Sequence, residues 1–295
     1  MNRIDAAFRD KPIFMPYFPL GYPDLKTSID VLEALAQNGA DLIEVGLSFS
    51  DPLADGPVIQ KATQVALEKG ITIKKSLEAV KELRRRGVEI PLVLMGYYNP
   101  MLAYGLEKFV YEAVQAGADG FIVPDLPLEE SGEFELALRS PAVLSGSRAS
   151  STSEKNPRSP LTTPVLADGA RAVPAHFGSA VPLIPMLAPT TSDERMETIA
   201  RHAKGFIYLV SVTGVTGERK SIAEGLGDLI SRVREHSSAP VCVGFGIGTP
   251  EQARQVGALA DGVIVGSACV KTIGGSERPV ETAVEFAKSF KSALR

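Results

Sequence analysis

The 295-residue sequence contains few of the side chains that build metal centres and disulfide frameworks. Its two cysteines, Cys242 and Cys269, lie in different apolar segments, without CxxC spacing and without a nearby histidine. Its three histidines, His176, His202 and His236, fall in an irregular stretch or at the ends of expected helices. This scarcity argues against a metal site, a disulfide scaffold and a His-based catalytic triad, and it indicates a reducing compartment.

An excess of positive charge is also missing. The chain has 31 Lys and Arg against 35 Asp and Glu, a net charge of -4, so nothing suggests binding to nucleic acid or to an anionic membrane. The run Arg84-Arg85-Arg86 is expected to be a solvated helix end, where the helix dipole favours cations. The N-terminal segment MNRIDAAFRDKP lacks a signal or transit pattern, and no apolar run reaches membrane-spanning length. We therefore expect a cytoplasmic protein with a small-molecule ligand.

Short apolar runs alternate with segments of helical periodicity along most of the chain, a pattern typical of βα units around a parallel sheet. The expected strands cover residues 13–20, 42–45, 92–95, 120–123, 183–187, 206–210, 241–243 and 262–265. The expected helices cover residues 28–37, 74–85, 107–116, 129–138, 193–203, 226–235, 250–256 and 280–293. Eight repeats favour a closed (β/α)8 TIM barrel over an open doubly wound sheet.

Residues 140–180 interrupt this pattern between the fourth helix and the fifth strand. The stretch is rich in serine and proline and has no sustained helical or strand period. Such a composition cannot bury enough apolar surface to offset its ordering entropy. We predict a single barrel domain over residues 1–295 that carries a disordered, low-complexity insertion at 140–180, on the face opposite the active site. A frame-shifted or misjoined segment and a domain linker are the alternatives.

Two acids stand out in the segment IEVGLSFSDPLADG. Glu44 lies between Ile43 and Val45 in an apolar run, and Asp55 lies in the turn-rich loop that follows. In a barrel, catalytic groups stand at the carboxyl ends of strands and on the loops behind them. A buried acid needs a partner or has a catalytic task. An internal salt bridge for Glu44 and a turn role for Asp55 are the structural alternatives.

Turns of small residues follow the last three expected strands. Gly244 and Gly246 end the seventh strand, Gly266 and Ser267 end the eighth, and the segment SVTGVTG follows the sixth. Glycines let backbone N–H groups approach a phosphate closely, and a short helix beginning at Ser267 would add its positive end. The order of these turns predicts a phosphate site at the mouth of the barrel.

The segment IEVGLSFSDPLADGP closely resembles the signature of tryptophan synthase alpha subunits. Seven further segments match that family in the same order: MPYFPLGYPD, LMGYYNPM, VPDLPLEE, PMLAPTTSDERM, GFIYLVSVTGVTGER, VGFGIGTPEQ and VIVGSACVK. The resemblance covers the chain except for the insertion. It implies a lyase of tryptophan biosynthesis that cleaves indole-3-glycerol phosphate by a retro-aldol reaction to indole and glyceraldehyde 3-phosphate.

The resemblance implies roles for three residues near the strand ends. Glu44 matches the general acid/base that protonates indole C3 and takes the proton of the side-chain hydroxyl. Asp55 matches the carboxylate that accepts the indole N–H, and Tyr208, which position alone makes a packed core residue, matches a tyrosine beside the glutamate. The local sequence agrees, because apolar flanks should raise the pKa of Glu44 towards neutrality while Asp55 stays ionised in a more polar loop.

The resemblance also implies substrate and partner contacts. The matching positions are Tyr17 and Tyr97 in the indole pocket, Thr216 and Gly217 in a mobile loop, Gly244, Gly246, Gly266 and Ser267 around the phosphate, and Asp51 and Asp125 in loops that respond to a partner. That partner is a beta subunit carrying pyridoxal phosphate, in an alpha2-beta2 heterotetramer. No metal or organic cofactor is implied in this chain.

Two departures from the family pattern are evident. Ser48 stands where the family usually has proline, which predicts a less rigid loop, and the insertion has no counterpart in the family. Two other functions remain open: a stand-alone lyase that releases free indole, and a non-catalytic activator of a beta subunit. The presence of both Glu44 and Asp55 argues against the activator.

Overall fold

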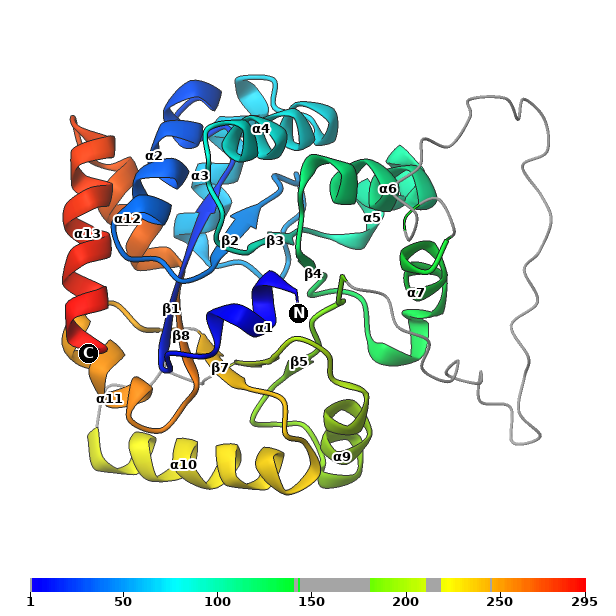
Figure 1. Cartoon of the computed structure of the whole chain (residues 1–295), viewed down its shortest axis with the longest axis vertical. Helices are drawn as coiled ribbons and strands as arrows, with labels where there is room; N and C mark the ends of the chain where they lie inside the picture. The colour runs from blue at the N-terminus through cyan, green and yellow to red at the C-terminus, as the bar shows by residue number, and fades with distance from the viewer. Residues whose placement is uncertain (1, 141–142, 144–180, 211–218, 245) are drawn as a thin grey trace.

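The computed structural model describes residues 2–140, 143, 181–210, 219–244 and 246–295. Eight parallel strands form one sheet in the order β4-β3-β2-β1-β8-β7-β6-β5, and helices surround them (Figure 1). The strands are β1 (Ile13–Pro19), β2 (Ile43–Gly46), β3 (Leu92–Met95), β4 (Gly120–Ile122), β5 (Met186–Leu187), β6 (Ile207–Val210), β7 (Val241–Gly244) and β8 (Gly262–Val265). All eight expected strands are confirmed in order, and β5 is shorter than expected.

The sheet closes on itself between β4 and β5. Phe121 of β4 forms an isolated parallel bridge with Leu183, which precedes β5. The Phe121 N–H donates to the Pro182 carbonyl over 2.9 Å, and the Ile184 N–H donates to the Phe121 carbonyl over 2.8 Å. With these two edges joined, the strands form the TIM barrel that their number predicted.

Several strands are followed by two helices instead of one. The helices are α1 (Arg3–Ala7), α2 (Leu25–Gln37), α3 (Pro57–Glu68), α4 (Ile73–Arg85), α5 (Tyr98–Tyr104), α6 (Leu106–Ala116), the 3-10 turn η1 (Leu128–Glu130), α7 (Gly132–Leu138), α9 (Asp193–His202), α10 (Arg219–His236), α11 (Pro250–Gly257), α12 (Ser267–Gly274) and α13 (Pro279–Ala293). Helices α1, α3 and α5 were not expected, because a pattern of one helix per strand assigns only the longer outer helix. Helix α12 begins at Ser267, as predicted.

Helix α1 covers the amino-terminal end of the barrel (Figure 1). Ile4 is fully buried, and a side chain on Gly120, at the start of β4, would press against it. Phe8, which ends the helix, packs against Phe206 with ring centroids 5.9 Å apart. Apolar side chains therefore close this end, and the carboxyl-terminal end is the side on which a cavity can open.

Three aspartates brace the amino-terminal ends of the strands in the same way. Each stands just before a strand, accepts the backbone N–H of the preceding strand, and donates its own N–H to the carbonyl of the same residue. The pairs are Asp41 with Phe14, Asp119 with Leu92 and Asp261 with Val241, with carboxylate distances of 2.7, 2.9 and 2.9 Å. A cation pairs with each carboxylate: Lys291, Arg84 and Lys11, respectively.

Arg84 is not the solvated helix end that the sequence predicted. Its side chain is 14% exposed and pairs with Asp119. Its guanidinium also donates to three backbone carbonyls, those of Val88, Ile90 and Gly117. A cation that satisfies three carbonyls and a part-buried carboxylate together ties α4 to the segments that precede β3 and β4.

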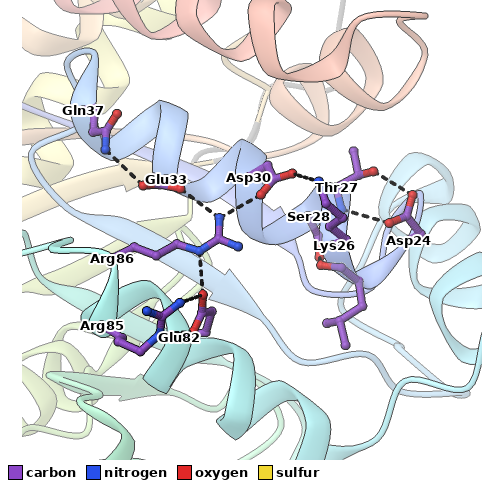
Figure 2. Close-up of polar contacts among 11 residues, drawn as sticks. Asp24, Lys26, Thr27, Ser28, Asp30, Glu33, Gln37, Glu82, Arg85 and Arg86 are labelled. Carbon is purple, nitrogen blue, oxygen red and sulfur yellow. Dashed lines mark hydrogen bonds and ion pairs between the residues drawn. The ribbon is translucent and has the colours of Figure 1, made fainter.

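The prediction is also wrong for Arg86, which joins two helices. Its guanidinium donates to Asp30 and Glu33 on α2 and to Glu82 on α4 (Figure 2). Arg85 is 74% exposed and pairs only locally with Glu82, which agrees with the prediction for that residue. The partners of Arg86 on α2 lie more than 50 residues away, and no local pattern indicates them.

No helix within the described ranges is long and apolar enough to cross a membrane. Residues 141–142 and 144–180 lie outside the described part of the chain. The disordered insertion within a single domain therefore stays a prediction.

We expect Asp119→Ala to destabilise the barrel by about 3 kcal/mol, because it removes the acceptor of the Leu92 N–H and leaves Arg84 buried without its carboxylate. Urea unfolding measures the change. Glu251→Ala is the matched control: it breaks an exposed pair with Arg254 and should cost less than about 1 kcal/mol. Equal losses in the two variants would contradict a bracing role for Asp119.

Candidate active site

The alternation of side chains along the strands turns Glu44 into the barrel. Residues in register on neighbouring parallel strands point to the same side. Tyr17 on β1 is in register with Glu44 on β2, and both line one cavity together with Tyr208 of β6. Ile43 and Val45 therefore face the outer helices, so the apolar flanks of Glu44 belong to the core around the barrel.

A cavity of about 240 Å³ opens at the carboxyl-terminal ends of the strands. Strand ends and the segments that follow them supply all of its lining: Tyr17, Glu44, Asp55, Ile59, Met95, Tyr208, Gly246, Ile247, Gly248, Ile264, Gly266, Ser267 and Ala268. Its titratable groups are two carboxyls and two phenols. Such a set can move protons and orient a polar ligand.

Glu44 carries a carboxyl group that water barely reaches. The residue is 1% exposed, and its Oε1 atom has no hydrogen-bond partner in the described part of the chain. Burial raises the pKa of Glu44 to about 8, and the negative charge of Asp55 adds to the rise. Glu44 therefore holds a proton at neutral pH. The alternative of an internal salt bridge is wrong for the residues that the structure describes.

Asp55 is half-buried on the loop after β2 and ionises at a lower pH than Glu44. Burial raises the pKa of Asp55 to about 6, and a hydrogen bond from the Tyr97 hydroxyl to its Oδ2 atom, over 3.0 Å, opposes the rise. The Tyr97 hydroxyl itself accepts the Ala54 N–H over 3.0 Å. The loop is less polar than predicted, but the predicted order of the two pKa values is confirmed. Between the two values, one cavity holds a protonated carboxyl beside a carboxylate.

Two glycines make room for the two cavity tyrosines. A methyl group on Gly46 would come within 2.4 Å of the Tyr17 hydroxyl oxygen, and one on Gly244 within 2.4 Å of the Tyr208 hydroxyl oxygen. Burial and the charges of the two cavity acids raise the pKa of both phenols well above the ordinary value, so both stay protonated. Gly244, predicted to cradle a phosphate, thus also makes the space that Tyr208 occupies.

Small residues form another part of the cavity wall. Gly246 and Gly248 follow β7, and Gly266 follows β8 at the point where α12 begins with Ser267. The first N–H groups of a helix have no partner within the helix and carry partial positive charge. Gly266, the N-cap residue of α12, has no side chain with which to cap the helix start. This turn therefore offers N–H donors to an anion at the edge of the cavity.

A second cavity, of about 470 Å³, lies beside the loops that follow β4 and β5. Its lining is mainly apolar and holds two acids: Glu135, which pairs with Arg139 over 3.0 Å, and the exposed Asp125, which accepts the Tyr98 N–H over 2.9 Å. The unpaired buried carboxyl lies in the smaller cavity, so we place the candidate active site there.

The comparisons with known proteins agree on one family. The model of the family described as "Tryptophan synthase alpha chain" matches residues 5–144 and 171–295. A protein named tryptophan synthase alpha chain from Chloroflexus aggregans is 42% identical over 301 residues, which cover 99% of this chain and 98% of that protein. The chain belongs to the tryptophan synthase alpha chain family.

Two further relatives are a solved structure of an alpha subunit and a longer protein that contains a similar region. A crystal structure of tryptophan synthase subunit alpha from Legionella pneumophila aligns with a TM-score of 0.79 and 32% identity, over 100% of this chain and 98% of that one. A protein named tryptophan synthase from Saccharomyces cerevisiae is 37% identical over 291 residues, which cover 98% of this chain but 36% of the yeast protein. Residues 145–170, which belong to the expected insertion at 140–180, fall outside the family match.

The structure brings together most of the residues that the sequence singled out. Those that line the cavity are Glu44, Asp55, Tyr208, Tyr17, Gly246, Gly266 and Ser267. Tyr97 reaches the site through its hydrogen bond to Asp55. Thr216 and Gly217 lie outside the described residues. The roles that the tryptophan synthase alpha chain resemblance gave to all of these residues remain predictions.

The loops around the mouth hold the remaining predicted residues. Asp51 is exposed on the loop after β2. Asp125 is exposed after β4, and its two oxygens accept the Tyr98 N–H at 2.9 and 3.2 Å, at the start of α5. The Ser48 hydroxyl donates to the Leu20 carbonyl over 3.4 Å, which ties its loop to the end of β1. That contact supplies a restraint at the position where the sequence resemblance led us to expect a less rigid loop.

Sequence reasoning missed several apolar lining residues. Met95 is in register with Gly46, and Ile264 lies two residues before Gly266, so strand alternation could have found both. Ile59 lies in the first turn of α3, a helix that the sequence pattern had not indicated. These side chains supply the apolar surface that desolvates Glu44.

The raised pKa of Glu44 predicts how Glu44→Gln affects stability. A carboxyl with a higher pKa in the folded state favours folding at low pH, and that contribution is lost as pH rises to the folded pKa of about 8. The stabilising effect of Glu44→Gln should therefore grow by on the order of 2 kcal/mol between pH 6 and pH 9. Urea unfolding of both proteins at the two pH values measures this, and a constant difference would contradict a buried, protonated Glu44.

Proposed function

We propose that this chain cleaves indole-3-glycerol phosphate to indole and glyceraldehyde 3-phosphate, as an enzyme of tryptophan biosynthesis. The observation that carries the proposal is the protonated Glu44 beside the ionised Asp55 in a cavity with an uncapped helix start on its wall. Membership in the tryptophan synthase alpha chain family supports it. The chemistry is acid-base catalysis and requires no cofactor in this chain.

Glu44 supplies the proton that starts the cleavage. It protonates C3 of the indole ring, and the positive charge that develops is stabilised by Asp55, which accepts the indole N–H. Low exposure strengthens this electrostatic interaction. An acid with a pKa near the working pH is suited to donating a proton and then taking one back.

The Glu44 carboxylate then removes the proton of the side-chain hydroxyl next to C3. The O–H electron pair forms the aldehyde C=O, and the carbon–carbon bond breaks, returning its electrons to the indole ring. Glu44 ends protonated, as it began, so the cycle consumes no net proton. Tyr208 keeps its hydroxyl proton throughout and assists at Glu44.

The phosphate of the substrate is assigned to the turns after β7 and β8. Gly246, Gly266 and Ser267 line the cavity there, and the start of α12 offers N–H donors. With the phosphate placed there, the indole ring lies beside Tyr17 and beside Tyr97, whose hydroxyl is bonded to Asp55. The family resemblance adds Thr216 and Gly217 to the substrate contacts, and both lie outside the described residues.

The proposed partner is a tryptophan synthase beta subunit that carries pyridoxal phosphate, in an alpha2-beta2 assembly in the cytoplasm. The yeast tryptophan synthase supports a partner, because the region like this chain is about a third of a longer polypeptide. Asp51 and Asp125 are exposed on loops beside the cavity mouth, where they can respond to docking.

Indole release from indole-3-glycerol phosphate tests the activity. We expect Glu44→Gln to lower kcat roughly 10²- to 10⁴-fold, since it removes the proton donor, and Asp55→Asn to lower it by roughly 10²-fold. Glu251→Gln is the matched acid-to-amide control on an exposed helix and should keep full activity. Full activity of Glu44→Gln would refute the assigned role. No release by the unaltered chain, while a beta subunit is still activated, would favour the non-catalytic activator.

A saturating beta subunit should raise the rate of indole release, because docking is expected to close the site and exclude water from it. Steady-state rates with and without the partner measure the effect. Fast release that the partner does not change would favour a stand-alone lyase and contradict the proposed coupling.

A further inference from the structure

No described residue donates a hydrogen bond to the Oε1 atom of Glu44, which needs a donor once the carboxyl group has lost its proton. After it gives its proton away, a carboxylate stands in a position that is 1% exposed, with Oε1 unpaired in the described part of the chain. A buried carboxylate without hydrogen bonds is costly. A group that donates to this carboxylate would stabilise the ionised half of the catalytic cycle.

Among the residues that the structure describes, few titratable groups interact with Glu44. Asp55 is an anion and Cys242 is a weak donor, so neither suits a carboxylate. Tyr17 and Tyr208 are phenols that stay protonated, and both line the same cavity. Only a hydroxyl among these groups can donate a strong hydrogen bond.

Tyr17 lies on the strand adjacent to that of Glu44, whereas Tyr208 lies on β6. Tyr17 is in register with Glu44 on the adjacent strand, and its hydroxyl extends over Gly46, two residues beyond Glu44 on the same inner face. Gly46 leaves the space: a methyl group there would lie 2.4 Å from the hydroxyl oxygen and 2.7 Å from the ring carbon that bears it. The glycine thus fixes where the Tyr17 hydroxyl lies.

The pairs Tyr17–Gly46 and Tyr208–Gly244 repeat one arrangement. In each, a tyrosine lies on one strand, and its hydroxyl covers a glycine near the end of the next strand, β1 over β2 and β6 over β7. If Tyr17 and Tyr208 only enclosed an indole ring, phenylalanine rings without hydroxyl groups could do so equally well. The two pairs differ in the residue opposite the tyrosine, which is Glu44 for Tyr17 and Cys242 for Tyr208, so only Tyr17 is in register with the carboxyl.

We propose that Tyr17 is a positioning residue whose hydroxyl donates to the ionised Glu44 carboxylate, and that Gly46 is the size-determining residue that admits this hydroxyl. The role rests on the proposed cleavage reaction. It differs from the wall of an indole pocket, which would act on substrate binding alone.

The test is Tyr17→Phe, which removes one oxygen atom. Loss of a hydrogen bond to a charged group should lower kcat roughly tenfold and change KM less than about twofold. Because the ionised form loses a donor, the pKa of Glu44 should rise by roughly one unit, moving the alkaline limb of the kcat/KM profile to higher pH. Tyr22→Phe, whose hydroxyl donates to the Gly274 carbonyl outside the cavity, is the matched control and should change neither.

A carbon-13 NMR titration of the Glu44 carboxyl gives the same pKa without any turnover. The shift should appear in Tyr17→Phe and be absent in Tyr22→Phe. This readout separates the two proposals, since a chain that releases no indole would refute the activity while the titration still tests the contact.

Gly46→Ala should reproduce the shift by displacing Tyr17. Gly132→Ala is its matched control, because a methyl group there meets nothing within 4 Å. If Gly46→Ala does not fold, Tyr17→Phe decides the question alone. The proposal is wrong if Tyr17→Phe raises KM but leaves the pKa of Glu44 unchanged, or if only Tyr208→Phe moves it.

Discussion

The withdrawal of the Glu44 carboxyl from water is the constraint on which the rest of the site depends. Strand alternation turns Glu44 inward, and apolar residues such as Met95 and Ile264 surround it. Burial alone would leave a neutral, inert acid. Here burial and the nearby charge of Asp55 together raise the pKa of Glu44 to about 8, close enough to neutral pH for a group that donates and then accepts a proton.

The two ends of the barrel treat polar groups differently. At the amino-terminal end, Asp41, Asp119 and Asp261 each hold a backbone N–H and a cation, so their buried charges are satisfied. At the carboxyl-terminal end, the Oε1 atom of Glu44 has no hydrogen-bond partner among the described residues, and Gly266 offers no side-chain cap to the start of α12. The ion pairs and hydrogen bonds at the amino-terminal end stabilise the barrel and so offset the cost of the unpaired polar groups at the carboxyl-terminal end. A bound ligand can supply hydrogen-bond partners for those groups.

The sequence predicted the barrel and the two acids Glu44 and Asp55 better than it predicted the residues that contact or surround other parts of the site and the core. Eight apolar runs were enough for the barrel, and an acid flanked by Ile43 and Val45 was enough to place Glu44 inside. Arg84 and Arg86 were misassigned because their partners lie on other elements, brought close only by the closed fold. Ile59 was missed with α3, and the packing of Gly244 against Tyr208 could not be seen before the register of β6 with β7 was known.

Tyr97 shows how the protonation of Glu44 depends on a residue outside the cavity lining. Its hydroxyl is held by the Ala54 N–H and donates to Asp55, which opposes the burial that raises the pKa of Asp55. An ionised Asp55 in turn adds to the raised pKa of Glu44. The order of the two pKa values therefore depends on a chain of two hydrogen bonds that starts in the loop after β2. A movement of that loop would change both acids together, so loop position and acid-base state are physically coupled in this barrel.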